Sequence, residues 1–173
     1  MKTTKKIFRL FGDLILLALL VALDQLTKMA AVIQLKDKPP FVLWEGVFEL
    51  QYLENRGAAF GVLQNQKVFF VIITIVMLIG ISYVLMKMPQ DKKYWLFDKT
   101  LIIMAAGGIG NFIDRLMNDY VVDFFYFTLI DFAIFNVADI YITVSCIFFG
   151  ILVLFYYKEH DFDFLRFKKG EKD

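Results

Sequence analysis

The sequence predicts an α-helical integral membrane protein with four transmembrane helices and a small antiparallel β-sheet, or flap, on the extracytoplasmic side. Hydrophobic residues make up 59% of the 173 positions, which exceeds the roughly 45–50% of apolar residues in soluble domains. The mean hydropathy is +0.60, and several apolar runs are long enough to cross a bilayer. We therefore expect residues 1–173 to form a single membrane-embedded domain.

Four apolar runs account for the predicted transmembrane helices, since a helix needs roughly 20 residues to cross a bilayer. They lie at about residues 11–33, 68–86, 96–117 and 135–157. The first run follows a basic start, as in a signal peptide, but it continues past Asp24 and Lys28 without a convincing cleavage site. We expect this run to be retained as the first transmembrane helix.

Lysine and arginine counts predict how the helices are oriented, because cytoplasmic segments are enriched in these residues. Residues 1–9 and 87–99 carry four each and residues 158–173 carry five, whereas residues 118–136 carry none. Both termini are therefore expected in the cytoplasm. Residues 158–173 would form a cytoplasmic tail, which we expect to be loosely held after His160.

The first outer loop, residues 34–67, is expected to form the sheet. Pro39 and Pro40 interrupt any helix, and residues 48–52 alternate between apolar and polar side chains as in a half-buried strand. The segment NRGAAFG, residues 55–61, supplies a turn with two glycines. We predict a small antiparallel sheet on the outer membrane surface, with this turn able to cover a site.

The composition excludes several classes of protein. A net charge of +1 excludes a strongly basic nucleic-acid-binding protein, so we expect no nucleic-acid partner. A single cysteine excludes a disulfide within one chain, and one cysteine with one histidine argues strongly against a zinc site built from nitrogen and sulfur ligands. We expect neither a metal nor an organic cofactor.

Two acidic residues in the second outer segment are candidate catalytic groups. Asp123 in VVDFF and Asp139 in FNVAD have apolar neighbours and no adjacent cation. Desolvation raises the pKa of a carboxyl group, and a second carboxylate nearby raises one of the two further. Such a pair can share one proton, with one carboxylate activating water and the other protonating a carbonyl oxygen. The alternative is that each is a solvated loop acid, and on residue chemistry alone Asp119 and Asp131 are rivals.

Other polar residues have both a structural and a functional interpretation. Asp24 and Lys28 lie four residues apart on one helix face, and we favour a mutually neutralising structural pair over a proton relay. Asn111 and Arg115 have the same spacing. Either Arg115 reaches lipid headgroups, or the two residues point their donors into a cavity. Asp114 could pair with Arg115 or with another neighbour.

Small residues mark a turn and a packing surface. Asn55 and Gly57 begin the NRGAAFG turn. Turn chemistry explains the glycines there, and the alternative is that Asn55 offers its amide to a bound backbone. Gly107, Gly108 and Gly110 in the third apolar run permit close helix packing within a membrane.

Five segments together resemble lipoprotein signal peptidase, also called signal peptidase II. They are DQLTK (24–28), NRGAAFG (55–61), GGIGNFIDR (107–115), VVDFF (121–125) and FNVAD (135–139). Each is weak alone, but all five occur in the family's order and cover everything except the two ends and the cytoplasmic loop. Members of this family are intramembrane aspartic peptidases of bacteria. They remove the signal peptide of prolipoproteins by cutting just before the diacylglyceryl-modified cysteine.

The resemblance implies a role for each matching residue. Asp123 and Asp139 would be the catalytic pair, with Asp24 and Lys28 as a supporting structural pair. The residues that hold substrate or order the pair would be Asn55, Gly57, Asn111, Arg115 and Asn136. Ile140 departs from the Ser or Thr often found after the last aspartate. We expect this change to alter local hydrogen bonding without abolishing activity.

The resemblance also implies the setting of the reaction. The partners would be diacylglyceryl-modified prolipoproteins and membrane lipids, and the chain would act as a monomer in the bacterial inner, or cytoplasmic, membrane with its site near the outer face. One alternative is a small proton-coupled transporter with intramembrane carboxylates, although the usual inverted repeats are absent. Another is a metal-dependent lipid-headgroup transferase. Asp119 and Asp123 have a suitable DxxxD spacing, but the glycine-rich motif that should precede it is missing.

Overall fold

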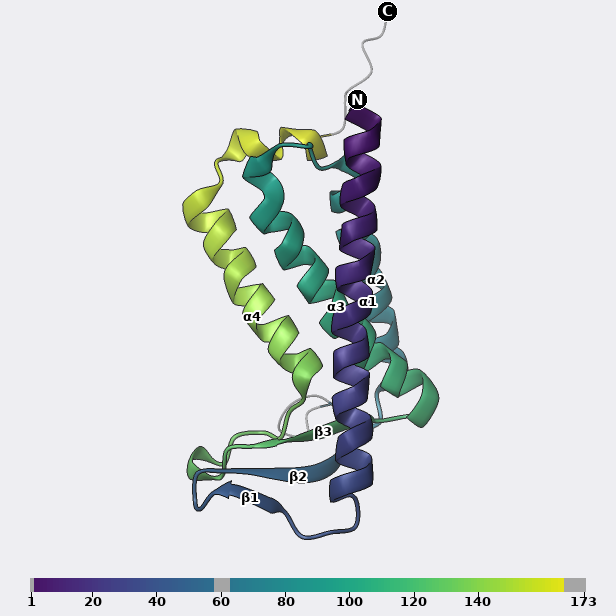
Figure 1. Ribbon diagram of the computed structural model, residues 1–173, viewed down its shortest axis with the longest axis vertical. Coiled ribbons are helices and arrows are strands. Elements are labelled where there is room, and N and C mark those ends of the chain that lie inside the picture. The colour runs from purple at the N-terminus through teal and green to yellow at the C-terminus, as the bar shows by residue number, and fades with distance from the viewer. Residues whose placement is uncertain (1, 58–62, 167–173) are drawn as a thin grey trace, which may run out of the picture.

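The computed structural model describes residues 2–57 and 63–166, which form a mainly helical molecule with a three-stranded sheet at one end (Figure 1). The long helices are α1 (Lys2–Leu35), α2 (Lys67–Lys87), α3 (Trp95–Asn118) and α4 (Val137–Ile151), and α4 continues into a π-helical turn, η4 (Leu152–Tyr156). The strands are β1 (Phe41–Trp44), β2 (Phe48–Asn55) and β3 (Val121–Tyr126). Short 3₁₀ helices are η2 (Lys92–Tyr94), η3 (Thr128–Ile130) and η5 (Glu159–Leu165). This architecture confirms the predicted combination of apolar helices and a small antiparallel sheet.

Three of the helices in the described chain are long and apolar enough to cross a membrane: Lys67–Lys87, Lys92–Asn118 and Val137–Tyr156. The first helix, α1, has 34 residues but carries charges along its length. Its Asp24 and Lys28 side chains are buried against the rest of the molecule, while many of its leucines are exposed. Polar groups facing inward and apolar groups facing outward suit a helix surrounded by lipid, and the membrane span of α1 remains a prediction.

Helix α3 packs against α1, α2 and α4, and its glycines show why the contacts are close. A Cβ atom on Gly107 would lie 2.5 Å from the backbone oxygen of Ala138 in α4. One on Gly108 would meet a methionine side chain of α2, and one on Gly110 would meet the carboxylate of Asp24 in α1. Each glycine therefore admits a different neighbouring helix, as expected for small residues at helix contacts in membranes.

The sheet has the order β1-β2-β3, with both pairs antiparallel. Strands β1 and β2 come from the first outer loop, as predicted. Strand β3 comes from the second outer segment, which we did not predict to be a strand, and its Leu53↔Asp123 register places Asp123 beside β2. An isolated bridge between Phe125 and Phe135 then connects β3 to the segment that enters α4. The sheet thus joins the two outer segments into one unit.

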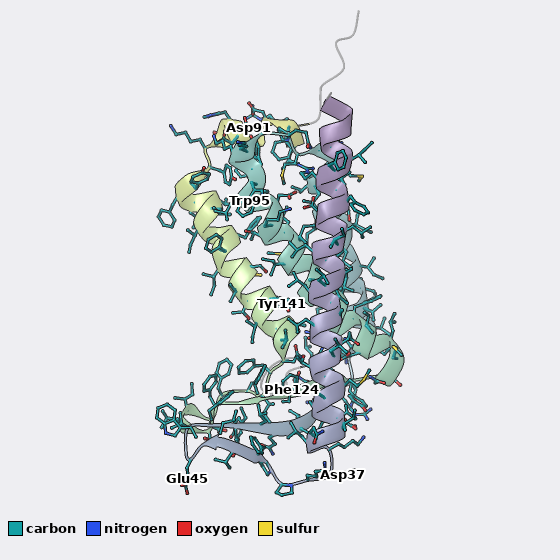
Figure 2. The ribbon with its side chains drawn as sticks, viewed as in Figure 1. Asp37, Glu45, Asp91, Trp95, Phe124 and Tyr141 are labelled. Atoms are coloured by element: carbon teal, nitrogen blue, oxygen red, sulfur yellow. The ribbon has the colours of Figure 1, made fainter. Side chains whose placement is uncertain are left out.

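The sheet lies at one end of the molecule, and the first turns of α1 and the helix η5 lie at the other. Figure 1 shows the start of α1 and the helix η5 at the end away from the sheet. In Figure 2, Asp91 and Trp95 lie near that end, whereas Asp37 and Glu45 lie at the sheet end. This arrangement fits an even number of crossings.

Residues 158–166, the part of the tail that the structure describes, pack against the rest of the molecule. This contradicts the expectation of a loosely held end. Lys93 Nζ donates to Asp161 Oδ1 at 2.5 Å, and Tyr94 Oη donates to the backbone oxygen of Asp161 at 2.8 Å. The two phenylalanines of η5 pack against the aromatic cluster beneath it. The charges of this segment suggested a solvated tail, but its alternating aromatic residues anchor it. Residues 167–173 lie outside the described chain.

Candidate active site

Asp123 and Asp139 are connected through a single residue, Asn136. The Asn136 side-chain amide donates from Nδ2 to Asp123 Oδ1 at 2.6 Å. The Asn136 backbone N–H donates to Asp139 Oδ2 at 3.1 Å. Both carboxylates also line one cavity. Strand β3 and helix α4 therefore bring the two predicted acids into one site.

The first turn of α4 explains how FNVAD positions Asp139. Asn136 is the N-cap residue, and its side chain accepts a hydrogen bond from Asp139 N at 3.0 Å, while the Asp139 carboxylate bonds back to the cap. This reciprocal arrangement is a capping box, and Asn is among the best N-cap residues. The Ala138 N–H donates to Asp24 Oδ1 of α1 at 2.9 Å. The N-terminus of α4 is therefore fixed both locally and from α1.

Asparagine amides hold the remaining carboxylate oxygens. Asn55 Nδ2 donates to Asp123 Oδ2 at 2.7 Å, and Asn111 Nδ2 donates to Asp139 Oδ1 at 2.8 Å. Asn136 is fully buried and is not part of the cavity lining. Its position therefore favours ordering of the acid pair over direct contact with a substrate.

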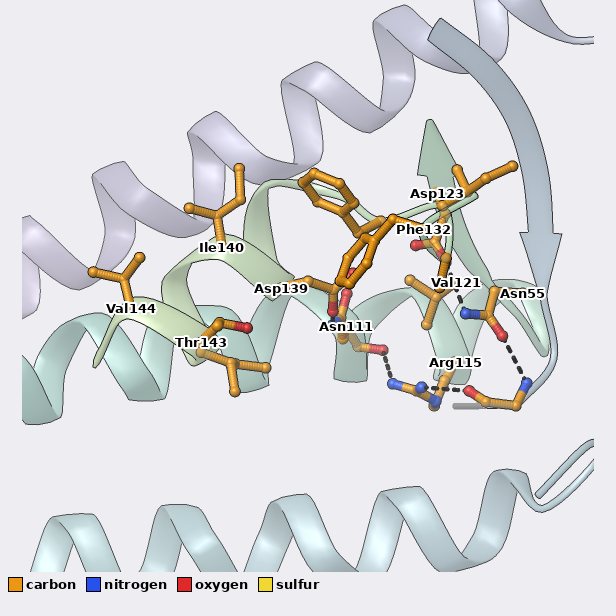
Figure 3. A pocket seen from close by; sticks show the side chains of 15 residues that line it. Asn55, Asn111, Arg115, Val121, Asp123, Phe132, Asp139, Ile140, Thr143 and Val144 are labelled. Carbon is orange, nitrogen blue, oxygen red and sulfur yellow. Dashed lines mark hydrogen bonds between the residues drawn. The ribbon is translucent and has the colours of Figure 1, made fainter. Parts of the chain in front are cut away.

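Arg115 fixes the start of the NRGAAFG turn. Its Nη2 donates to the backbone oxygen of Gly57 at 3.2 Å (Figure 3). Its guanidinium also lies 4.5 Å from the ring centre of Phe70. The Gly57 N–H in turn donates to Asn55 Oδ1 at 2.9 Å. The other residues of this predicted turn, 58–61, lie outside the described chain. The described part of the turn is thus tied both to α3 and to the Asn55 amide that contacts Asp123.

The cavity has a volume of about 460 Å³ and one polar end (Figure 3). The polar end holds Asn55, Gly57, Asn111, Arg115, Asp123 and Asp139. The rest of the lining is mainly apolar and comprises Val121, Phe132, Ala133, Ile134, Phe135, Ile140, Ile142, Thr143 and Val144. Such a cavity suits a ligand with a long apolar part and one polar group at the acids.

Burial alters the acidity of Asp123, which lies in β3 outside the predicted membrane spans. Its side chain is 1% exposed. Desolvation and then the charge of Asp139 raise the pKa of Asp123 to about 7, although hydrogen bonds from Asn55 and Asn136 and the charge of Lys28 oppose the increase. A carboxyl group of this acidity can gain or lose a proton near neutral pH, as general acid–base catalysis requires.

The structure separates the proposed pair from its sequence rivals. Asp119 is the C-cap residue that follows α3; it lies on the surface and pairs with Lys67 at 2.5 Å. Asp131 is also exposed, and accepts a hydrogen bond from Tyr126 Oη at 2.6 Å. Neither contributes to the cavity lining. Asp119 and Asp123, although they have DxxxD spacing, therefore lie in different environments.

Asp114 has partners that the sequence left ambiguous. Its Oδ2 lies 3.1 Å from Lys28 Nζ and accepts a hydrogen bond from the Val122 backbone N–H at 3.1 Å. Gln25 Nε2 donates to its other oxygen at 3.0 Å. Asp114 therefore links α3 to α1 and β3. Of the two predicted options, it pairs with another neighbour, Lys28, and not with Arg115.

Sequence reasoning also missed most of the apolar cavity wall. Phe132 and Ile134 lie between η3 and the FNVAD motif, in a short stretch that contains no recognisable motif of its own. Thr143 follows Asp139 by four residues, so helical spacing alone could have placed it on the same face. The remaining wall residues required the fold.

Asp123 is buried and Asp139 is half-buried, and both are held by amides at the polar end of an apolar cavity. This arrangement is the one expected of a membrane aspartic peptidase. The comparisons identify the family within this class. The model of the family described as Signal peptidase (SPase) II matches residues 16–155. The chain therefore belongs to the signal peptidase II family.

Relatives support this assignment over most of the chain. A lipoprotein signal peptidase of Streptococcus thermophilus (strain CNRZ 1066) is 46% identical over 142 residues, covering 82% of this chain and 90% of the relative. One from Streptococcus pyogenes serotype M5 (strain Manfredo) is 46% identical over 148 residues, covering 84% and 93%.

Solved structures have the same fold. One, described as a bacterial membrane enzyme structure obtained by the in meso method at 2.3 Å resolution, gives a TM-score of 0.74 at 32% identity and covers 94% of this chain and 93% of that chain. A second, described in the same words at 1.9 Å resolution, gives a TM-score of 0.72 at 33% identity, with 84% and 94% covered.

Proposed function

We propose that the chain is an aspartic endopeptidase that removes signal peptides from diacylglyceryl-modified bacterial prolipoproteins, cutting just before the lipidated cysteine. The observation that supports it most directly is the connection of Asp123 and Asp139 through Asn136 at the polar end of an apolar cavity. The family and the names of the relatives agree with it. They give no support to the alternative of a small proton-coupled transporter.

The proposed reaction needs one proton shared between Asp123 and Asp139. The ionised carboxylate removes a proton from a water molecule, whose oxygen attacks the carbonyl carbon of the scissile bond. The protonated carboxyl donates to the carbonyl oxygen, which gives a tetrahedral diol. Collapse of the diol breaks the C–N bond, and the leaving amine takes a proton from the pair. Because the two acids interact, their protonation steps belong to the pair.

The other predicted residues divide into two proposed roles. Asn111 and Asn136 orient the acids through the hydrogen bonds described above. Asn55, Gly57 and Arg115 line the cavity, so their polar groups are placed to meet a substrate backbone. The apolar wall is suited to the acyl chains or the apolar segment of a lipidated precursor.

The proposed orientation follows from charge and from the shape of the molecule. The described parts of the three basic segments lie at the end that holds the start of α1 and η5, opposite the sheet (Figure 1). By the positive-inside rule this end faces the cytoplasm, so the acid pair lies near the outer face of the bacterial cytoplasmic membrane. A monomer in contact with membrane lipids is sufficient, since the cavity is built from one chain.

Cleavage of a diacylglyceryl-modified prolipoprotein in detergent with EDTA tests the function. We expect wild type to cleave before the lipidated cysteine, and the variants Asp123→Asn and Asp139→Asn to lose cleavage while keeping a cooperative thermal transition. A folded variant of either kind with wild-type activity would refute the acid pair. Loss of wild-type cleavage on metal removal would contradict the proposal that the acid pair works without a metal.

A further inference from the structure

A buried lysine is connected to the acid pair through one intervening residue, Asn111. Lys28 in α1 is 3% exposed, and its ammonium group contacts three acceptors. It lies 2.9 Å from Asp24 Oδ2 and 3.1 Å from Asp114 Oδ2, and it donates to Asn111 Oδ1 at 2.9 Å. An ammonium group has three N–H donors, so this set uses all of them. The pair predicted from DQLTK is thus part of a larger group.

The contact with Asn111 determines which way its amide faces. An ammonium group can only donate, so it requires the amide oxygen of Asn111 on its side. The same oxygen accepts a hydrogen bond from Asn136 Nδ2 at 3.2 Å. The Asn111 amide nitrogen must then face away, and it donates to Asp139 Oδ1 at 2.8 Å. A reversed amide would place two oxygens together at Asp139 and two donors together at Lys28.

The charge of Lys28 also acts on the acid pair. The charged groups that face Asp123 are Asp139 in α4, Lys28 in α1 and Arg115 in α3. The positive charge of Lys28 favours the ionised form of Asp123 and opposes the effect of burial on its pKa. Around Lys28 itself lie the carboxylates of Asp24 and Asp114, which reduce this field without removing it.

We propose that Lys28 is a positioning residue for the acid pair: it holds the Asn111 amide in the orientation that donates to Asp139. This inference rests on the proposed function. An ion pair with Asp24 alone would satisfy a structural role, since residues four apart on a helix can neutralise one another. The additional bond to Asn111 connects α1 to the reacting groups. Lys28 is not among the residues that line the cavity, so it acts without touching substrate.

The variant Lys28→Met tests this role, because it removes both the donor and the charge while keeping a similar length. We expect kcat to fall by about 10- to 100-fold, the size of effect seen when a partner that orients a metal ligand is removed, with KM little changed. We also expect the pH optimum of kcat to rise by about one unit, since an opposite charge near a carboxyl group lowers its pKa by about that much or more. The readout is the full pH profile of kcat with a lipidated substrate.

Lys99→Met is the matched control. Lys99 in α3 is also a lysine between two aspartates, and it pairs with Asp13 of α1 and with Asp98 at 3.0 Å. Lys99 contacts α1 at Asp13, which is nearer the N-terminal end of that helix than Lys28 is. We expect this variant to lower the melting temperature while leaving the pH optimum and the kcat of the folded enzyme unchanged.

A double variant guards against misfolding, because Lys28→Met leaves two buried carboxylates without a cation. Lys28→Met with Asp114→Asn removes one positive and one negative charge, and the asparagine keeps an acceptor for the Val122 N–H. We expect a folded enzyme that still shows the low kcat. The inference is overturned if both Lys28 variants keep the wild-type pH profile and if their kcat, calculated per folded molecule, equals that of wild type. Failure of the proposed function would differ, since wild type itself would then not cleave.

Discussion

Asp24 of α1 accepts a hydrogen bond from the backbone N–H of Ala138 at 2.9 Å, although the two residues are 114 positions apart in the chain. Ala138 precedes Asp139, so the first helix of the chain fixes the start of the last one. The same carboxylate also pairs with Lys28 at 2.9 Å. Asp24 therefore accepts a hydrogen bond from the first turn of α4 and also neutralises Lys28 on its own helix, α1.

Replacement of Asp24 is expected to destabilise the fold strongly. Asp24→Ala leaves the Ala138 N–H unpaired, which costs about 1–3 kcal/mol, and it removes one of the two carboxylates around Lys28. Asp24→Asn keeps an acceptor for the N–H and is expected to be milder. Thermal unfolding in detergent measures both variants. Equal melting temperatures for the two would show that the hydrogen bond to α4 contributes nothing.

Gly110→Ala is expected to disturb the same contact from α3. The new Cβ would lie 3.0 Å from Asp24 Cγ and 3.2 Å from Ala138 Cβ, and overpacking of this kind costs about 1–3 kcal/mol. Both stability and cleavage should therefore decrease. Gly80→Ala in α2 is the control, because its Cβ would meet nothing within 4 Å, and its melting temperature should be unchanged or higher. A tolerated Gly110→Ala would mean that α1 and α3 separate more easily than the contact indicates.

Asn136→Ser separates helix capping from orientation of the acids. Serine is a good N-cap residue, so its hydroxyl can still accept from Asp139 N, but the donor to Asp123 is lost. We expect Asn136→Ser to be less stable than wild type, because a buried oxygen of Asp123 loses its donor, and cleavage to fall by about tenfold or more, the effect of removing a partner that orients a metal ligand. Asn136→Ala should lose the cap as well, at a cost of about 1 kcal/mol. A fully active serine variant would leave Asn136 with a capping role alone.

The raised pKa of Asp123 predicts how stability depends on pH. An unfolded aspartate has a pKa of about 3.9, whereas Asp123 in the folded chain has one of about 7. Between these values the folded chain binds more protons, so the contribution of Asp123 to the free energy of unfolding decreases as pH rises from about 4 to about 7. Melting temperatures at several pH values should show a steeper decrease for wild type than for Asp123→Asn. Parallel curves would contradict a perturbed Asp123.

The surface aspartates provide a test of specificity. Asp131→Asn and Asp119→Asn are expected to keep full cleavage, because both side chains are exposed and lie outside the cavity lining. Initial rates with the lipidated substrate measure this. Loss of activity in a folded Asp131→Asn variant would move the acid pair to a different combination of residues.

The ends of α2 and α3 could be predicted closely because each helix contains a long run of uncharged residues. Helices α2 and α3 begin and end within one residue of the predicted 68–86 and 96–117. Strand β3 was missed, since VVDFFY has four buried residues in succession and lacks the alternation of a half-buried strand. Its pairing partner lies in the other outer segment, and only the tertiary fold supplies it.

The site could be predicted in its residues but not in its connections. The motifs singled out Asp123, Asp139 and Asn111, and the structure gathers them around one cavity. The bond from Lys28 to Asn111 could not be predicted, because it joins residues 83 positions apart on different helices. The catalytic and binding roles themselves remain predictions for the experiments above.

The sheet has a consequence for biosynthesis. Asp123 is held by a strand that pairs with β2, and Asp139 lies in α4, the last long helix of the described chain. During synthesis, a chain of which only α1, α2 and α3 have left the ribosome therefore lacks Asp139 and also Asn136, which connects Asp139 to Asp123. With the proposed pair, we expect hydrolysis only after the final helix has docked, so an unfinished chain would be inert toward neighbouring membrane proteins.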